Sequence, residues 1–226
     1  MTRKQILSSL IAIAAIIVLA IAYFVYTSGS GDGIPQEGTK FAIVLSPRDK
    51  TLGSPKAPIQ VVEYAAPSCP HCAHWNEDVF PTLKKEYIDT GKVYYVFRVF
   101  PLSSLDVAVE SMARCLPPGS YFQFIDMMYR NQVRWDPDGN NIPDVHGALI
   151  QMGRIAGMSE DQVNNCISPS SNGDEQAAIS QVGQYAAKTY NIDSTPTFII
   201  NGRITPEAVT VTGLRDVLNG LLTKKS

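Results

Sequence analysis

The sequence has few of the residues that protein metal sites require. It contains four cysteines and three histidines, with a single CxxC pair at Cys69 and Cys72. A structural zinc site needs four ligands, usually two such pairs or one pair with downstream histidines. No metal site is therefore expected. Internal repeats and low-complexity tracts are also missing, and 226 residues are enough for one or two compact domains.

Charge of one sign does not dominate the sequence either. Lysine and arginine together number 19 and aspartate and glutamate 21, which gives a net charge of −2. A nucleic-acid-binding protein usually carries a basic face, so the composition gives no indication of a nucleic-acid partner.

Residues 6–26 form a long apolar run without a charged residue. As a helix rising about 1.5 Å per residue, this run is long enough to span one bilayer core. Arg3 and Lys4 precede it, which predicts a single-pass anchor in a bacterial inner membrane, with the chain start in the cytoplasm and the rest in the periplasm. A cleaved signal peptide and a soluble periplasmic protein are the alternative, because Ala20-Ile21-Ala22 fits a cleavage site.

The remaining sequence alternates between strand and helix patterns. The expected strands are residues 41–45, 59–64, 93–100 and 197–200. Asn201-Gly202 is expected to form a hairpin turn that leads into residues 203–205, and residues 46–58 are expected to form a loop. Residues 70–89 carry a helical apolar stripe, which Pro81 should kink. A strand, a helix and a second strand in succession predict parallel pairing of the two strands.

Between residues 103 and 173 the sequence has helical patterns and no strand pattern. Expected helices are residues 104–116, 120–131, 144–157 and a short one capped by Ser159 and Gln162, followed outside this block by 174–190 and 213–222. We therefore predict an α/β domain interrupted by a helical block. The expected parts of the chain are residues 1–28 (cytoplasmic tip and anchor), 29–38 (flexible linker), 39–102 and 174–226 (α/β domain) and 103–173 (inserted helices).

The CPHC motif at Cys69-Pro70-His71-Cys72 favours redox chemistry over metal or haem binding. Haem attachment requires a histidine directly after the second cysteine, where this chain has Ala73. Cys69 is expected at a helix N-terminus, where free backbone N–H groups and the helix dipole stabilise a thiolate, and it should be the exposed cysteine of the pair. Cys72 belongs to the buried stripe, and His71 can add positive charge or a hydrogen bond. A stabilised reduced form makes the disulfide a strong oxidant.

Three segments, VVEYAAPSCPHC, ARCLPPGSYFQFIDMM and STPTFIING, resemble the DsbA-like branch of the thioredoxin superfamily, including its membrane-anchored bacterial members. The resemblance extends from about Gly53 to Leu222. It implies a thioredoxin fold with an inserted all-helical domain, and a strongly lowered pKa of Cys69.

The resemblance also implies roles for residues outside the motif. Pro196 matches a cis-proline that faces the CxxC pair and turns the backbone of Thr195 toward the substrate. Glu63 matches a buried acid that exchanges a proton with Cys72, and the alternative is a solvent-facing strand residue. Cys115 and Cys166 match a non-catalytic disulfide, and the alternative is two free buried thiols.

These observations predict a thiol:disulfide oxidoreductase that introduces disulfide bonds into exported proteins. The Cys69–Cys72 pair, with Pro70, His71 and Glu63, should carry the reaction without a cofactor. The resemblance implies a quinone-linked membrane partner for reoxidation. A disulfide isomerase or reductase is the nearest alternative, because oxidases of this family often carry valine at the position of Thr195. An alternative of another class is a Cu(I) metallochaperone with Cys69 and Cys72 as ligands.

Overall fold

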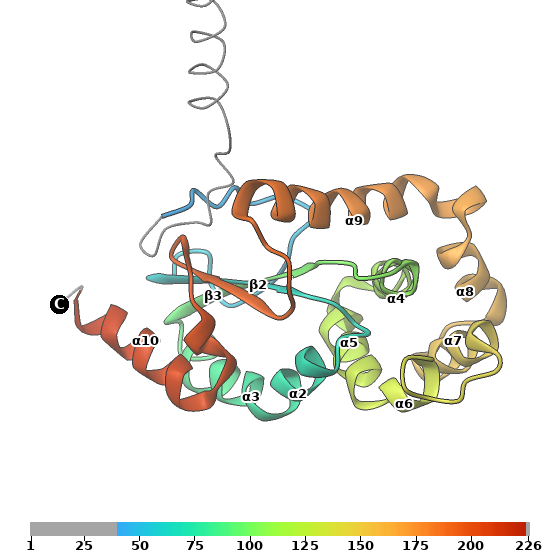
Figure 1. Ribbon diagram of the computed structural model, residues 1–226, viewed down its shortest axis with the longest axis horizontal. Coiled ribbons are helices and arrows are strands. Elements are labelled where there is room, and N and C mark those ends of the chain that lie inside the picture. The colour runs from blue at the N-terminus through green and yellow to red at the C-terminus, as the bar shows by residue number, and fades with distance from the viewer. Residues whose placement is uncertain (1–39, 225–226) are drawn as a thin grey trace, which may run out of the picture. The chain divides into compact units, whose positions relative to one another are not determined.

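The structure is a computed structural model that describes residues 40–224. The described chain contains a five-stranded sheet in the order β1-β3-β2-β4-β5 (Figure 1). The strands are β1 (Lys50–Leu52), β2 (Ile59–Ala65), β3 (Val93–Val99), β4 (Thr197–Ile200) and β5 (Arg203–Ile204). β2 and β3 are parallel, as predicted. β4 pairs antiparallel with the other side of β2.

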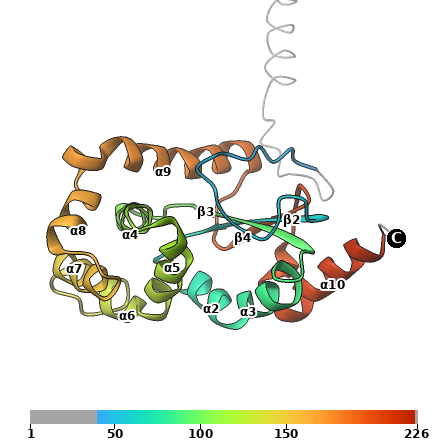
Figure 2. The same ribbon diagram turned by 180° about the vertical axis from the view of Figure 1, so that it is seen from behind.

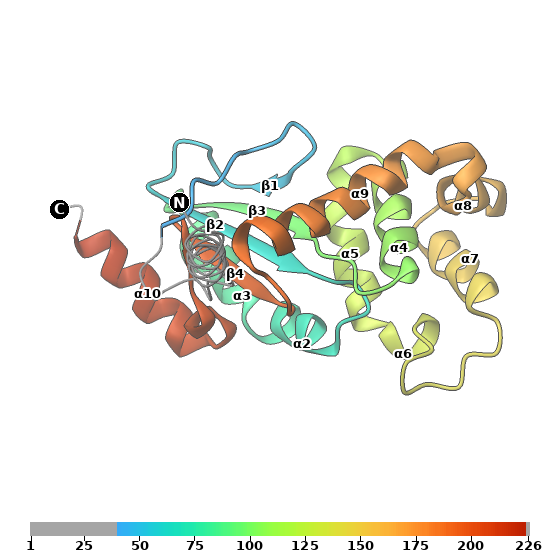
Figure 3. The ribbon, with the colours of Figure 1, turned by 45° about the horizontal axis from the view of Figure 1, so that its top comes forward.

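Helices cover both faces of this sheet. Helices α2 (Pro70–Asp78), α3 (Phe80–Leu83) and α10 (Val211–Thr223) lie on one face, and α9 (Pro169–Tyr190) crosses the other (Figures 2 and 3). The central strands β2 and β3 are therefore buried along nearly their whole length, which explains their almost continuous apolar sequences. The CPHC motif lies at the carboxyl end of β2, where α2 begins.

The predicted strand at residues 41–45 is wrong. Phe41 donates one backbone hydrogen bond to the carbonyl of Gly202 at 2.6 Å, but the segment pairs no further. Val44 and Leu45 are exposed, so the apolar run does not mark a buried strand. The edge strand is instead β1, inside the predicted loop of residues 46–58, where it pairs antiparallel with β3.

The predicted helix at residues 70–89 is divided into three pieces. It is interrupted at Val79, between α2 and α3, and ends in a π-helical turn, η1 (Lys84–Ile88). The interruption lies two residues before Pro81, which has no N–H group and whose ring crowds the carbonyl of the preceding turn. The proline effect was predicted, whereas the π-helical turn was not.

The inserted segment is helical, as predicted. Its helices are α4 (Ser104–Cys115), α5 (Tyr121–Arg130), α6 (Gln132–Trp135), α7 (Val145–Ile155) and α8 (Glu160–Ile167), and a short 3₁₀ turn, η2 (Pro118–Ser120), precedes α5. A second 3₁₀ turn, η3 (Pro206–Val209), lies outside the insertion, between β5 and α10. The Ser159–Gln162 capping box at the start of α8 is confirmed. The predicted boundary at residues 173 and 174 falls inside α9, which begins five residues earlier than expected.

None of the helices within residues 40–224 has the length and hydrophobicity needed to cross a bilayer. The predicted anchor and linker lie outside the described residues.

Candidate active site

Cys69 is the N-cap residue of α2, in an extended conformation at φ −73° and ψ 118°. Its N–H donates to the carbonyl of Ala66 at 3.0 Å, and its carbonyl accepts the N–H of Ala73 at 3.1 Å. Pro70 occupies the first helical position, where a missing N–H costs nothing because that group has no partner within a helix. The sulfur of Cys69 therefore lies beside the free N–H groups of the first helical turn.

This environment lowers the pKa of Cys69 to about 5. The largest cause is a hydrogen bond with the Cys72 thiol, which outweighs the opposing effect of burial. The Thr195 side chain and the backbone N–H groups of Cys72 and His71 act in the same direction. The Cys69 sulfur also lies 3.4 Å from the carbonyl oxygen of Thr195. The His71 side chain is exposed, and its backbone N–H is the group that acts on Cys69 here.

The second thiol has the opposite properties. Cys72 is fully buried, and burial together with the Cys69 thiolate raises its pKa well above the ordinary value. Both cysteines are free thiols in this structure. The expectation of an exposed Cys69 is wrong, because only 5% of its surface is accessible. The pair thus combines a thiolate that has little exposed surface with a fully buried thiol that keeps its proton.

Glu63 is buried beneath the pair, with 2% of its surface exposed. The solvent-facing alternative is therefore excluded. Its carboxyl accepts a hydrogen bond of 2.5 Å from the hydroxyl of Tyr95 on the neighbouring strand β3. Burial raises the pKa of Glu63 to about 8; the Tyr95 hydrogen bond opposes this shift and the Cys69 charge adds to it. A carboxyl group that titrates near neutral pH can both donate and accept a proton.

The bond between Thr195 and Pro196 is cis. It directly precedes β4, and the pairing of Thr197 with Tyr64 on β2 carries this loop to the end of the strand that leads to Cys69. The structure thus brings together Glu63, the CPHC motif and the Thr195–Pro196 bond, from three separate parts of the sequence.

Comparisons with known proteins agree with this geometry. The family model described as Thioredoxin matches residues 45–220. The chain belongs to this family. Among its solved neighbours, alpha-DsbA1 of Wolbachia pipientis superposes with a TM-score of 0.70 and 29% identity, over 80% of this chain and 94% of that one. The predicted resemblance and the thioredoxin fold with a helical insertion are confirmed.

Two relatives of this thioredoxin-family chain carry names that describe disulfide chemistry. A protein of Rickettsia typhi named a protein-disulfide oxidoreductase is 32% identical over 165 residues, 73% of this chain and 58% of that protein. Disulfide bond formation protein D of Bacillus subtilis is 27% identical over 168 residues, 68% of each chain. The chain spans less than two thirds of the length of the Rickettsia relative.

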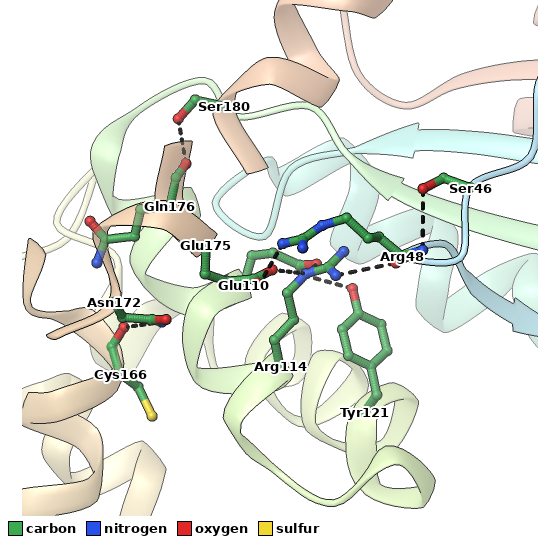
Figure 4. Close-up of polar contacts among 10 residues, drawn as sticks. All are labelled: Ser46, Arg48, Glu110, Arg114, Tyr121, Cys166, Asn172, Glu175, Gln176 and Ser180. Atoms are coloured by element: carbon green, nitrogen blue, oxygen red, sulfur yellow. Dashed lines mark hydrogen bonds and ion pairs between the residues drawn. The ribbon is translucent and has the colours of Figure 1, made fainter. Parts of the chain in front are cut away.

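The other two cysteines of this thioredoxin-family protein form a disulfide. Cys115, at the end of α4, and Cys166, in α8, are joined with an S–S distance of 2.05 Å. One turn before Cys115, the buried carboxyl of Glu110 accepts hydrogen bonds of 2.6 Å from the Arg114 guanidinium and from the Tyr121 hydroxyl (Figure 4). Glu175 of α9 bridges Arg114 and Arg48. This cluster links α4, α5 and α9 with the segment before β1.

Sequence reasoning missed two residues that hold the loop before Cys69. Asp106 is fully buried, and its carboxylate accepts the N–H groups of Ser68 at 2.8 Å and Leu102 at 2.9 Å. Its position three residues after Ser103, with which it forms a capping box, is a signal that could have found it. Gln132 donates to two carbonyls of the same loop, and nothing in the sequence indicates this contact.

Proposed function

We propose that the protein is a thiol:disulfide oxidoreductase that donates the Cys69–Cys72 disulfide to exported proteins containing cysteine thiols. One observation carries the proposal: two neighbouring thiols have pKa values shifted in opposite directions, down to about 5 for Cys69 and well above the ordinary value for Cys72. A thiolate that is stable at neutral pH favours the reduced form, so its disulfide accepts electrons readily.

The reaction begins when a substrate thiolate attacks the Cys69 sulfur of the disulfide. The S–S bond breaks, a mixed disulfide forms between the substrate and Cys69, and Cys72 leaves with the electron pair. Glu63, protonated below a pKa of about 8, supplies the proton that Cys72 takes up. The carbonyl of Thr195, 3.4 Å from the Cys69 sulfur, lies where an extended substrate chain can pair with it.

A second substrate thiolate then attacks the substrate sulfur of the mixed disulfide. Cys69 leaves as a thiolate, and its low pKa makes it a good leaving group. Two substrate thiols have become one disulfide, and two electrons have passed to the protein pair. Reoxidation requires an external acceptor, and we assign this role to a quinone-linked membrane partner.

This function includes a location outside the cytoplasm, where substrate thiols become disulfides. We propose that residues 6–26 tether the protein to the membrane, with a cleaved, soluble periplasmic form as the alternative. N-terminal sequencing of the protein recovered from both the membrane and the soluble fraction of its native cells distinguishes the two, because cleavage near Ala22 removes most of the apolar run.

The direction of electron flow is tested by the equilibrium between the purified protein and a glutathione redox buffer. The oxidase proposal predicts a reduction potential closer to about −120 mV than to about −270 mV, the values of a strong disulfide donor and of a reductase. A potential near the lower value contradicts the oxidase direction and favours a reductase. A second assay follows oxidation of a peptide with two thiols, which only a disulfide donor completes in one turnover.

A further inference from the structure

The loop before Cys69 is held by side chains of the helical insertion as well as by its own turn. Within the loop, the N–H of Cys69 bonds to the carbonyl of Ala66. From outside, Asp106 of α4 accepts the N–H of Ser68. Gln132, the first residue of α6, donates from the same Nε2 atom to the carbonyl of Pro67 at 2.7 Å and to that of Cys69 at 3.1 Å. One carboxamide thus ties two carbonyls on either side of Ser68.

Gln132 is itself fixed in place. The four-residue helix α6 is closed by a bond from the Asp136 N–H to the Gln132 carbonyl at 2.8 Å. Trp135 of the same helix is fully buried, and its indole N–H donates to the carbonyl of Met128 in α5 at 2.8 Å. Because the backbone of Gln132 is anchored by this turn and by Trp135, the carboxamide can restrain the loop from a fixed position.

We propose that Gln132 is a positioning residue for thiol–disulfide exchange: its carboxamide holds the carbonyls of Pro67 and Cys69 so that the first turn of α2 presents its N–H groups to the Cys69 sulfur. The inference rests on the proposed function, since it concerns the same thiol. It goes further in assigning control of that thiol to a residue of the inserted helices, 63 positions away in sequence.

The physical argument has two parts. First, the N–H groups of His71 and Cys72 reach the Cys69 sulfur only while Cys69 keeps its extended N-cap conformation, and the bond from Gln132 to the Cys69 carbonyl restrains ψ at that residue. Second, the carbonyl oxygens of Pro67 and Cys69 carry partial negative charge, one of them in the same residue as the thiolate. The Gln132 donors partly neutralise this charge, which also favours the thiolate. Loss of Gln132 therefore raises the pKa of Cys69.

The test compares Gln132→Ala and Gln132→Glu with the wild type in the full-length protein. Gln176→Ala is a matched control, because the Gln176 side chain likewise donates to a backbone carbonyl, that of Ile167 at 2.9 Å, but does so from α9, and no hydrogen bond among the described residues joins it to the loop before Cys69. The measurement is the pH titration of the Cys69 thiolate by its ultraviolet absorbance, with the equilibrium against glutathione and the thermal unfolding midpoint recorded for each variant.

Gln132→Ala should lower the acid dissociation constant of Cys69 by about three- to tenfold, as expected when hydrogen bonds of ordinary strength are lost. Gln132→Glu should lower it further, because a carboxylate repels both carbonyls and the thiolate. The equilibrium constant for oxidation of glutathione should fall in the same order. Gln176→Ala should leave both quantities unchanged.

A lower unfolding midpoint in the Gln132 variants with an unchanged Cys69 titration overturns the inference, since it indicates a purely structural contact. Equal titration changes in Gln176→Ala overturn it as well. Should Gln132→Ala not fold, Gln132→Asn, which keeps the amide but is shorter by one methylene, replaces it with the same expected direction. The proposed oxidase direction fails separately, if the wild-type potential itself lies near that of a reductase.

Discussion

The active site and the helical insertion each contain a pair of cysteines and a buried glutamate, yet only one of them is arranged for chemistry. Cys69 and Cys72 are two free thiols at the start of a helix, whereas Cys115 and Cys166 are joined across 51 positions. Glu63 has the neutral hydroxyl of Tyr95 as its hydrogen-bond partner, whereas Glu110 has the Arg114 guanidinium and the Tyr121 hydroxyl.

The difference shows that burial alone does not make a reactive group. Burial raises the pKa of both carboxyls, but Glu110 faces a fixed positive charge that opposes the shift. Glu63 lacks such a cation among its main influences, so its pKa rises to about 8, where the proton is exchanged readily at neutral pH. A buried carboxyl group without a neighbouring cation is a candidate functional group, whereas one that is paired with a cation connects parts of the structure.

The largest expected difference concerns the two cysteine pairs. Cys69→Ser should abolish thiol–disulfide exchange, because a serine hydroxyl forms no disulfide and the mixed intermediate is lost. The control is the double variant Cys115→Ala with Cys166→Ala, which should exchange thiols at the wild-type rate. Both are measured by oxidation of a dithiol peptide. Loss of exchange in the double variant contradicts the division between a reactive and a structural pair.

The next prediction concerns the pH dependence of stability. The folded-state pKa of Glu63, about 8, lies above the usual 4.5, so the folded protein keeps a proton that the unfolded chain releases. The contribution of this proton to the free energy of unfolding is complete below pH 4.5 and is lost as the pH rises to about 8. The total loss is at most about 5 kcal/mol. Urea unfolding of the oxidised protein across this range measures it. Glu63→Gln should remove most of the slope, and an identical slope in wild type and variant refutes the assignment.

Glu63→Gln should also slow exchange, since glutamine cannot pass a proton to Cys72. General acid–base catalysis of this kind contributes about 10²-fold at the lower end of its usual range. Single-turnover rates with a dithiol peptide, measured across the pH range, test this. A rate equal to that of the wild type at every pH shows that Cys72 obtains its proton elsewhere.

Removal of the second disulfide should affect stability more than catalysis. Cys115→Ala with Cys166→Ala opens a loop of 51 residues and should lower the free energy of unfolding by about 4 kcal/mol in the chain-entropy model. Urea unfolding in the Cys69→Ser background provides the comparison, since reduction there breaks the same single disulfide and should reproduce the loss. A change below about 1 kcal/mol contradicts a stabilising role.

The smallest predicted effect comes from Glu110→Gln, and its sign is opposite to that of Glu63→Gln. A carboxamide at position 110 offers one oxygen to two donors, the Arg114 Nε–H and the Tyr121 hydroxyl, so one donor loses its partner. The expected loss is about 1 to 3 kcal/mol. At pH 8, Glu63→Gln should stabilise the protein and Glu110→Gln destabilise it. Equal signs in urea unfolding at that pH contradict the distinction between the two glutamates.

The sequence predicts the parts of this fold that depend on local patterns. The strands around Val61 and Val96, the helix after Pro70 and the capping box at Ser159 follow from periodicity, turn residues and spacing. Prediction from the sequence fails where tertiary contacts determine the local structure. The apolar run at residues 41–45 lies along the surface, and a helix of four residues, α6, is too short to show a period.

The candidate site divides in the same way. The CPHC spacing predicts that Cys69 and Cys72 form a redox pair, and the helix start predicts the direction of the Cys69 pKa shift. The burial of Glu63 cannot be predicted from the pattern of its strand, because the neighbouring residues are apolar on both faces of the sheet and do not show which face is buried. The resemblance to the DsbA-like branch is the basis of that prediction. Asp106 and Gln132 meet the loop across 38 and 65 positions, contacts that no local pattern encodes.

The central claim is that the Cys69 thiolate is stabilised at the beginning of α2. Its most direct test is a titration of the reduced wild-type protein, with alkylation rate and thiolate absorbance followed as functions of pH. The account predicts a midpoint of about 5 for Cys69, with Cys72 still protonated at neutral pH. A midpoint near 8.5, the value of an ordinary cysteine, contradicts it.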